Sequence, residues 1–315
     1  MAEHTTEQAG TTDSDRAPTD LRVRLDKEVT LRVRHRPGAA DPAFLLVHGL
    51  ASNAGLWDEV AARLCAAGHA VYAVDLRGHG ETEAPEDDTY GTAAAAADVL
   101  AAGVQLGLTR AIVGGHSWGA DVALTLATEH PSFVAGLALV EGGYTDATVF
   151  YGTWERFVSM MSMAGPALEG VTLEDMRGYL RAMHPDWSDS AIEASLSSLR
   201  AGADGSLSPR LSPRQRTAIL RSVWSCPPSR LYAGITQPVT LLPATPVPDN
   251  GRIAPDVLAL FEQLRASLVR ATEGLPHATV HEYQGADHDL HAQHPDRVAT
   301  HLLELAESVG RSEVM

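Results

Sequence analysis

The hydrophobic residues near the beginning of this chain alternate with polar ones. Residues 21–25 have the sequence Leu-Arg-Val-Arg-Leu, and residues 29–33 have the sequence Val-Thr-Leu-Arg-Val. A period of two is typical of strands that bury one face and expose the other. The two segments are therefore predicted to form an antiparallel hairpin at the edge of a sheet.

The later strand candidates follow a different pattern, because each is a short and continuous apolar run. Such runs are typical of parallel strands that helices cover on both faces. They lie at residues 43–47, 70–74, 111–113, 136–140 and 239–242, and a further strand is expected at 279–283.

Helical segments separate these runs, at residues 55–67, 92–106 and 119–129. Thr92 is placed to cap the second helix, because its hydroxyl can accept a hydrogen bond from an amide of the first turn. Strands and helices that alternate in this way predict an α/β fold with a doubly wound, mostly parallel sheet.

A long helical stretch, residues 146–237, interrupts the alternation. It has no strong strand pattern, and its amphipathic segments lie at 153–163, 173–183, 190–200 and 213–223. An insertion between two parallel strands is expected over their carboxyl ends, where ligands bind. We therefore predict an α/β core of residues 21–145 and 238–315, with residues 146–237 as a helical cap.

Some apolar residues of the predicted cap are candidates for contact with a substrate, namely Trp154, Met160, Met163 and Trp187. Methionine and tryptophan at helical spacing usually belong to a core, and in a cap they can also line an apolar pocket. An apolar small-molecule substrate is expected.

The charge of the chain limits its partners. The 315 residues have a formal net charge of −16, which argues against nucleic acid or an anionic membrane as a principal partner. Residues 1–20 contain five acidic residues and one arginine and are predicted to be a disordered acidic tail. The patterns carry no information on the oligomeric state.

Several absences indicate a cytoplasmic protein. The first twenty residues lack the apolar core of a signal peptide, and no later stretch has the apolar length of a membrane span. The two cysteines, Cys65 and Cys226, form neither a CxxC pair nor a disulfide framework.

The clearest chemical motif is Gly115-His116-Ser117-Trp118-Gly119, which lies between a predicted strand and a predicted helix. A sharp turn at this point projects the serine hydroxyl above the sheet, and glycines at both flanks let the strand and the helix approach each other. Ser117 is therefore predicted to be a nucleophile, with the Trp118 amide as a donor to an oxyanion. His116 and the Trp118 side chain are expected to pack.

The motif and two earlier segments, His48-Gly49 and the run from Asp75 to Gly80 (Asp-Leu-Arg-Gly-His-Gly), together resemble the α/β-hydrolase superfamily. They occur in the superfamily's order, and the resemblance extends from about Leu21 to Val309. It implies a second oxyanion donor in the amide of Leu50. His48, Arg77 and His79 are expected to brace their loops.

The chain has 14 histidines, and the position of His288 distinguishes it as a general base. It follows the predicted strand 279–283, and the sequence Gly-Ala-Asp-His at 285–288 resembles the superfamily's Gly-x-Gly-His pattern, with the second glycine replaced. His291 and His294 lie further from the strand end. The base must lie within hydrogen-bond reach of the serine.

Two residues are candidates for the acid that orients this histidine. Most relatives have an aspartate after the strand that corresponds to 239–242, where this chain has a proline-rich loop and Asp249 as the nearest acidic residue. Some branches, including certain lactonases and haloalkane dehalogenases, place the acid at the end of the preceding strand, which here is Glu141. Glu141 is the preferred acid. Two alternatives stay open: Glu141 braces its loop instead, or Asp249 is the acid that orients His288.

These residues favour a serine hydrolase that cleaves a carboxylic ester or lactone. A C–C bond hydrolase and a non-catalytic ligand-binding receptor or scaffold on the same fold are the alternatives. No nucleotide-binding motif is present, so no cofactor is expected. The segment His288-Asp289-Leu290-His291 could hold a metal, but exposed loop histidines are more common, so no metal is expected either.

Overall fold

The alternating segments form the predicted hairpin in the computed structural model, which describes residues 17–85, 87, 89–162, 168–247, 255–275 and 277–314. Strands β1 (Thr19–Arg24) and β2 (Thr30–Arg36) pair antiparallel. The sheet begins earlier than predicted, because Thr19 and Asp20 already pair with His35 and Arg34. The Asp20 side chain also accepts a hydrogen bond of 3.1 Å from Arg32. The acidic tail predicted for residues 1–20 therefore extends too far, because residues 19 and 20 belong to β1. Residues 1–16 of the predicted tail lie outside the described residues.

The continuous apolar runs form the parallel part of an eight-stranded sheet. Its strand order is β1-β2-β4-β3-β5-β6-β9-β11, and every pair from β4 to β11 is parallel. All residues of β5 and β6 are buried, which explains why these segments contain no alternating polar residues. The bounds are β3 (Ala40–Val47), β4 (His69–Val74), β5 (Ala111–His116), β6 (Val134–Val140), β9 (Val239–Leu242) and β11 (Ala278–Val280).

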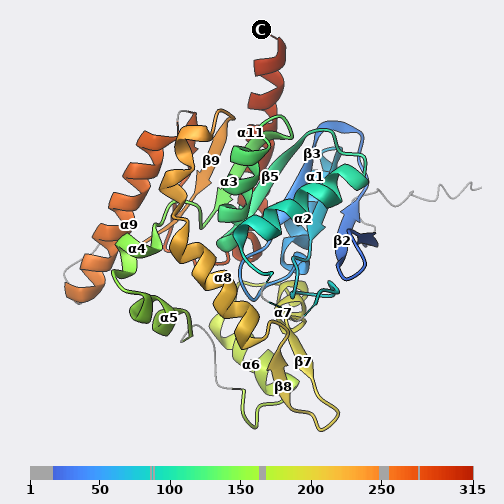
Figure 1. Ribbon diagram of the computed structural model, residues 1–315, viewed down its shortest axis with the longest axis vertical. Coiled ribbons are helices and arrows are strands. Elements are labelled where there is room, and N and C mark those ends of the chain that lie inside the picture. The colour runs from blue at the N-terminus through green and yellow to red at the C-terminus, as the bar shows by residue number, and fades with distance from the viewer. Residues whose placement is uncertain are drawn as a thin grey trace, which may run out of the picture.

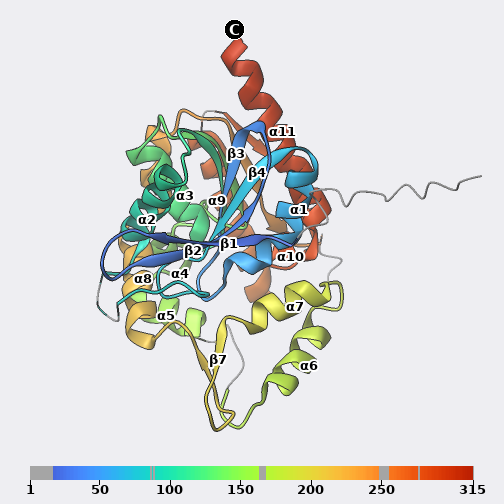
Figure 2. The ribbon, with the colours of Figure 1, turned by 90° about the vertical axis from the view of Figure 1, so that its right-hand side faces the viewer.

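Helices cover both faces of this sheet, so the doubly wound α/β prediction is confirmed. One hydrophobic cluster includes α2 (Thr92–Gln105), α3 (Trp118–Glu129) and part of α9 (Pro255–Gly274). The other includes α1 (Asp58–Ala66) and α11 (Pro295–Val314), with the 3₁₀ helix η2 (Ala54–Trp57) at its edge. Figure 2 shows α2 and α3 on one side of the sheet, with α1 and α11 on the other.

The predicted cap of α2 by Thr92 is wrong. The N-cap residue is Gly91, and no side chain caps this helix. The Thr92 hydroxyl instead accepts a hydrogen bond from Trp118 Nε1 and pairs with the hydroxyl of Ser222, each at 3.0 Å. The threonine therefore links α2 to α3 and to the inserted helices.

The insertion between β6 and β9 is mostly helical, and much of it lies at one end of the molecule (Figure 1). It contains α4 (Ala147–Tyr151), α5 (Trp154–Ser162), α6 (Leu173–Met183), α7 (Asp189–Leu196), α8 (Pro213–Ser225) and the 3₁₀ helices η3 (Pro228–Arg230) and η4 (Tyr232–Gly234). The predicted helix 190–200 ends at Leu196, because a short hairpin follows. That hairpin, β7 (Leu199–Ala201) with β8 (Leu207–Pro209), is too short to produce a strand pattern in the sequence.

The predicted strand 279–283 is divided into two short strands. β11 ends at Val280, and β12 (Tyr283–Gln284) then pairs in parallel with β10 (Ala244–Thr245), which follows β9. This small second sheet extends two chain segments beyond the carboxyl edge of the main sheet. In the described part of the chain, no helix has both the length and the apolar content that a membrane crossing requires.

Candidate active site

Ser117 lies in the sharp turn that joins β5 to α3. Its φ of 52° and ψ of −122° are strained for a residue with a side chain. The flanking glycines permit the turn, because a Cβ on Gly115 would lie 2.1 Å from the Gly119 carbonyl oxygen, and one on Gly119 would lie 2.5 Å from that of Val47. A strained serine between tightly packed glycines is the geometry of an exposed nucleophile.

The turn after β3 lies against this serine. A Cβ on Gly49 would approach Ser117 Cβ to 3.0 Å, so Leu50 directly follows a residue whose backbone lies against Ser117. In the described residues, neither the Leu50 amide nor the Trp118 amide donates a hydrogen bond to the protein. Two free amides beside a serine can stabilise an oxyanion that forms there.

Two buried histidines brace these loops. His48 Nδ1 donates to the Gly49 carbonyl oxygen at 2.7 Å, and its Nε2 accepts from the Leu76 amide at 3.0 Å. His79 Nε2 accepts from the amide of Ala51 at 3.1 Å. Burial lowers the pKa of His48 to about 4 and that of His79 to about 3, so both imidazoles are neutral and act as fixed hydrogen-bonding groups.

Glu141 follows β6 directly and has a positive φ of 48°. This unusual backbone directs the carboxylate across the carboxyl edge of the sheet. Its Oε1 accepts hydrogen bonds from the amide of Ala244, at 2.9 Å, and from the hydroxyl of Tyr144. Its Oε2 lies 2.8 Å from Nδ1 of His288. The carboxylate thus has three contacts: two hold it in place, and the third is to the predicted base.

The two groups stabilise each other's charged forms. Partial burial lowers the pKa of His288, but the hydrogen bond and negative charge of Glu141 outweigh this effect and raise it above the ordinary histidine value. Burial raises the pKa of Glu141, but the hydrogen bond and charge of His288, with the donors Tyr144 and Ala244, bring it below the ordinary glutamate value. An ionised acid therefore faces a histidine that accepts a proton readily.

His288 lies in the loop after β12, with a half-exposed side chain. His116, next to the nucleophile, donates from Nε2 to the His288 carbonyl oxygen at 2.9 Å. Ser117 and His288 make no hydrogen bond with each other within the described residues, which is common for catalytic pairs when no ligand is bound. The backbone contact from His116 nevertheless ties the loop of His288 to the serine turn.

The candidate substrate residues occupy different places. Trp154 belongs to an aromatic cluster with Phe157 and Trp224. Leu50 packs against a buried apolar group of the insertion, Ala147, Phe157 and Leu220. Met160 is 46% exposed. Trp187 lies between α6 and α7, stacks on His184 and packs with residues of both helices. Met163 and the alternative acid Asp249 lie outside the described residues.

Three contacts of this site were not predicted from the sequence. Tyr144 and the amide of Ala244 hold Glu141, and the ring of His116 bonds the loop of His288. Tyr144 lies three positions after Glu141, but this spacing carries no signal without the backbone conformation between them. His116 was expected to pack, and its fully buried ring also has this polar role.

The chain is similar to known proteins in both sequence and structure. The 2-(acetamidomethylene)succinate hydrolase of Mesorhizobium japonicum is 26% identical over 269 residues, which cover 85% of this chain and 88% of that protein. A crystal structure of E-2-(acetamidomethylene)succinate hydrolase has a TM-score of 0.72 and 23% identity, covering 92% of this chain and 99% of that one. This structural likeness shows the fold.

A shorter match has higher identity. An uncharacterized protein of Mycobacterium tuberculosis is 38% identical over 108 residues, and the chain spans 31% of the length of that relative. The family described as alpha/beta hydrolase fold matches residues 42–295, most of the sequence. The chain therefore belongs to the alpha/beta hydrolase fold family.

Proposed function

We propose that the protein is a serine hydrolase that cleaves a carboxylic ester or lactone through an acyl-enzyme. The observation that carries the proposal is the 2.8 Å contact between Glu141 Oε2 and His288 Nδ1 at the same sheet edge as the strained Ser117. Ser117 is the nucleophile, His288 the base and Glu141 the acid. This combination of groups is the one that activates a serine hydroxyl.

In the first half of the reaction, Ser117 Oγ attacks the substrate carbonyl carbon. Nδ1 of His288 holds its proton toward Glu141, which leaves Nε2 free to take the proton from the serine. The developing negative charge falls on the carbonyl oxygen, and the amides of Leu50 and Trp118 donate to it. The imidazolium that forms is stabilised by the ionised Glu141.

In the second half, the proton returns from His288 to the leaving alkoxide, and the alcohol departs from the acyl-enzyme. A water molecule then gives a proton to His288 while its oxygen attacks the acyl carbon. Collapse of that second intermediate releases the carboxylic acid and restores the serine hydroxyl. For a lactone, acid and alcohol leave as one hydroxy acid.

The proposed substrate is apolar near the scissile bond. Leu50 packs against a buried apolar group of the insertion, made of Ala147, Phe157 and Leu220, so an apolar wall adjoins the proposed oxyanion site. Residues 146–237 are proposed to act as the cap that forms this wall. Apolar walls with few polar groups are typical of small-molecule sites.

Labelling with a fluorophosphonate probe tests the proposal. The wild-type chain should form a covalent adduct at Ser117, and Ser117→Ala should form none and lose hydrolysis by several orders of magnitude. An unlabelled wild-type protein would instead indicate a receptor or scaffold. A panel of aryl esters of increasing chain length, compared with aliphatic and macrocyclic lactones, then defines the substrate.

Amide hydrolysis is a second candidate. One relative whose alignment covers most of both chains is a 2-(acetamidomethylene)succinate hydrolase, and the same acyl-transfer chemistry cleaves an activated amide. The panel therefore includes N-acyl enamides that match the esters in acyl chain. Higher kcat/KM on the enamides than on the matched esters would favour this candidate.

A further inference from the structure

Two histidines beside the proposed site are buried with ring nitrogens that have no partner. His291 is fully buried, and neither of its ring nitrogens makes a hydrogen bond within the described residues. His116 is 2% exposed, and its Nδ1 is likewise without a partner. A buried polar atom left unpaired costs free energy, so the unpaired ring of His291 points to a ligand that binds one of its nitrogens.

The burial of His291 changes the interpretation of its loop. The sequence favoured an exposed loop histidine, but the ring of His291 lies between Trp57, at 4.5 Å between centroids, and His116, at 4.3 Å. The short helix α10 (Leu290–Gln293) carries it into the core. His291 therefore faces the ring next to the nucleophile.

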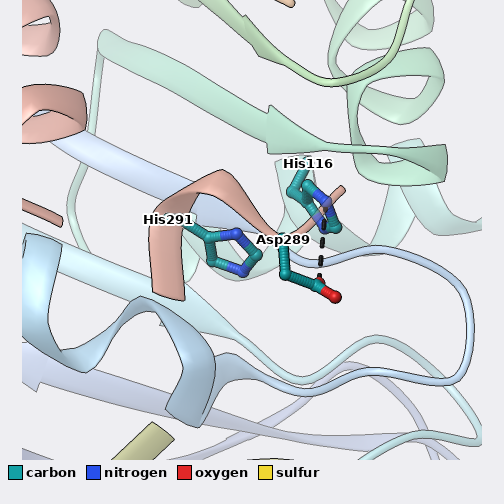
Figure 3. A group of neighbouring side chains, drawn as sticks. All are labelled: His116, Asp289 and His291. Atoms are coloured by element: carbon teal, nitrogen blue, oxygen red, sulfur yellow. Dashed lines mark ion pairs between the residues drawn. The ribbon is translucent and has the colours of Figure 1, made fainter. Parts of the chain in front are cut away.

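Asp289 completes a group of three ligating side chains. Its Oδ1 lies 3.7 Å from Nε2 of His116, and one ligand atom from each of Asp289, His116 and His291 lies within 4.8 Å of the others. Figure 3 shows Asp289 directed toward His116, with His291 beside them on α10. The Asp289 side chain is 28% exposed, which gives an ion a route from solvent.

The donor set selects the class of ion. Two imidazoles and one carboxylate suit zinc and its neighbours among the divalent transition metals, whereas calcium and magnesium prefer oxygen ligands throughout. Bonds of about 2.0–2.2 Å require the three donors to draw together around the ion. We propose that His116, Asp289 and His291 bind a divalent transition-metal ion such as Zn²⁺, and that the bound ion inhibits hydrolysis at the neighbouring serine.

The inhibition rests on the function proposed above and follows from the position of the cluster. Asp289 follows His288 directly, and the rings of His116 and His288 are 4.8 Å apart. Coordination through His116 Nε2 moves the ring proton to Nδ1 and removes the hydrogen bond that this ring now donates to the His288 carbonyl oxygen. The loop that carries His288 then loses the anchor that ties it to the turn of Ser117, so the proposed base is no longer held in position for the serine.

Binding of the metal alone tests the site without reference to activity. The full chain is treated with a chelator, dialysed and titrated with ZnCl₂ in competition with a chromophoric chelator. The wild type should bind one Zn²⁺ tightly, and Asp289→Asn and His291→Asn should each weaken binding at least about tenfold. Asp289→Asn changes a partly exposed residue, so it keeps the test informative if His291→Asn does not fold.

A second cluster provides the matched control. His281, His301 and Glu304 also bring three ligand atoms within 4.8 Å of one another, on α11 and the segment that follows β11. His301→Asn should leave the tight site intact. Tight binding that disappears in His301→Asn but persists in Asp289→Asn, or the absence of tight binding in the wild type, would overturn the proposal.

Activity measurements separate the inhibition from the proposed function. With a chromogenic aryl ester as the substrate, Zn²⁺ should slow hydrolysis by the wild type and by His301→Asn. For Asp289→Asn, the rate with Zn²⁺ is compared with the rate of the same variant without the metal, and the reduction should be much smaller. Tight binding with an unchanged rate would overturn the inhibition. A protein that binds Zn²⁺ at this site but hydrolyses nothing would contradict the proposed function and leave the metal site standing.

Discussion

Nδ1 of His288 and Oε2 of Glu141 lie 2.8 Å apart, although 147 positions separate the two residues in the chain. The contact arises because β6 ends just before Glu141, while the segment that carries His288 leaves the same sheet edge after β12. Parallel strands bring the residues at their carboxyl ends together. The proposed acid thereby lies one strand earlier than the position that the superfamily resemblance implies for most members.

The change Glu141→Gln tests this placement. The amide keeps the shape of the side chain but removes the negative charge that stabilises the imidazolium and selects the productive tautomer. We expect kcat to fall about 10²–10⁴-fold, by analogy with an acid-to-amide change in a serine triad. Steady-state kinetics on an aryl ester measure the effect.

Asp249→Asn is the matched control, because Asp249 is the other candidate acid. A group outside the triad gives no differential stabilisation of the transition state, so this change should reduce kcat less than about tenfold. A severe loss in Asp249→Asn together with a mild loss in Glu141→Gln would reverse the assignment of the acid. The proposed roles of Ser117 and His288 would survive that result.

The dependence of the rate on pH tests the pair in another way. His288 must be neutral to accept the serine proton, and Glu141 raises its pKa above the ordinary value of 6.5. We expect kcat/KM of the wild type to fall, as pH is lowered, with a midpoint above 6.5. In Glu141→Gln the lost charge no longer favours the imidazolium, so the midpoint should move to lower pH.

The residual activity of Glu141→Gln is sufficient for this comparison if the enzyme concentration is raised. Identical midpoints in the two proteins would mean that Glu141 does not act on the group that titrates. A wild-type rate that stays flat down to pH ~4.5 would exclude a histidine base.

The parts of the site that the sequence predicted have local signals. The turn at Ser117 is marked by glycines at fixed spacing between an apolar strand and a helix, and the strand bounds around it are close to those observed. The placement of Glu141 near His288 followed from the rule that parallel strands end at one edge. The catalytic roles of these residues stay predictions.

Other features depend on contacts that no local pattern encodes. His291 is buried because α10 turns it toward Trp57, a residue more than 200 positions earlier in the chain. Tyr144 reaches Glu141 because Glu141 has a positive φ, which is unusual for glutamate. Thr92 has the residue type of a helix cap, but its hydroxyl is occupied by Trp118 and Ser222. Tertiary contacts override the local preference in each case.

Tyr144→Phe tests how Glu141 is held. The buried Tyr144 hydroxyl donates to Glu141 Oε1, and its removal leaves a carboxylate oxygen in the site with one donor fewer. We expect the free energy of unfolding, measured with urea, to fall by about 1–3 kcal/mol. The kcat should fall less than in Glu141→Gln, because the charge remains.

The double variant Tyr144→Phe with Glu141→Gln distinguishes a role through Glu141 from general packing. If the tyrosine acts on kcat through Glu141, its loss should have little further effect on kcat once the carboxylate is gone. Effects on kcat that add in full would indicate that Tyr144 contributes by another route.

The last prediction concerns Gly142, which directly follows Glu141 and packs closely against the backbone of Ser117. A Cβ on Gly142 would lie 2.2 Å from the carbonyl oxygen of Ser117. The clashing atom belongs to the backbone of a turn that is already strained, so it cannot move without changing the position of the serine. Gly142→Ala should therefore destabilise the fold by about 1–3 kcal/mol and slow the labelling of Ser117 by a fluorophosphonate.

Gly178→Ala is the control for this change, because Gly178 lies in helix α6, where a Cβ would have no neighbouring atom within 4 Å beyond its own helix backbone. Alanine there should be neutral or stabilise the protein by up to about 1 kcal/mol, since glycine is unfavourable inside a helix. Urea unfolding and the rate of probe labelling are measured for both variants. The same glycine-to-alanine change should then lower the free energy of unfolding at position 142 but not at position 178. This difference measures the effect of the contact between residues 142 and 117. Gly142→Ala with the stability and labelling rate of the wild type would show that the two strand ends are not packed as closely as this geometry requires.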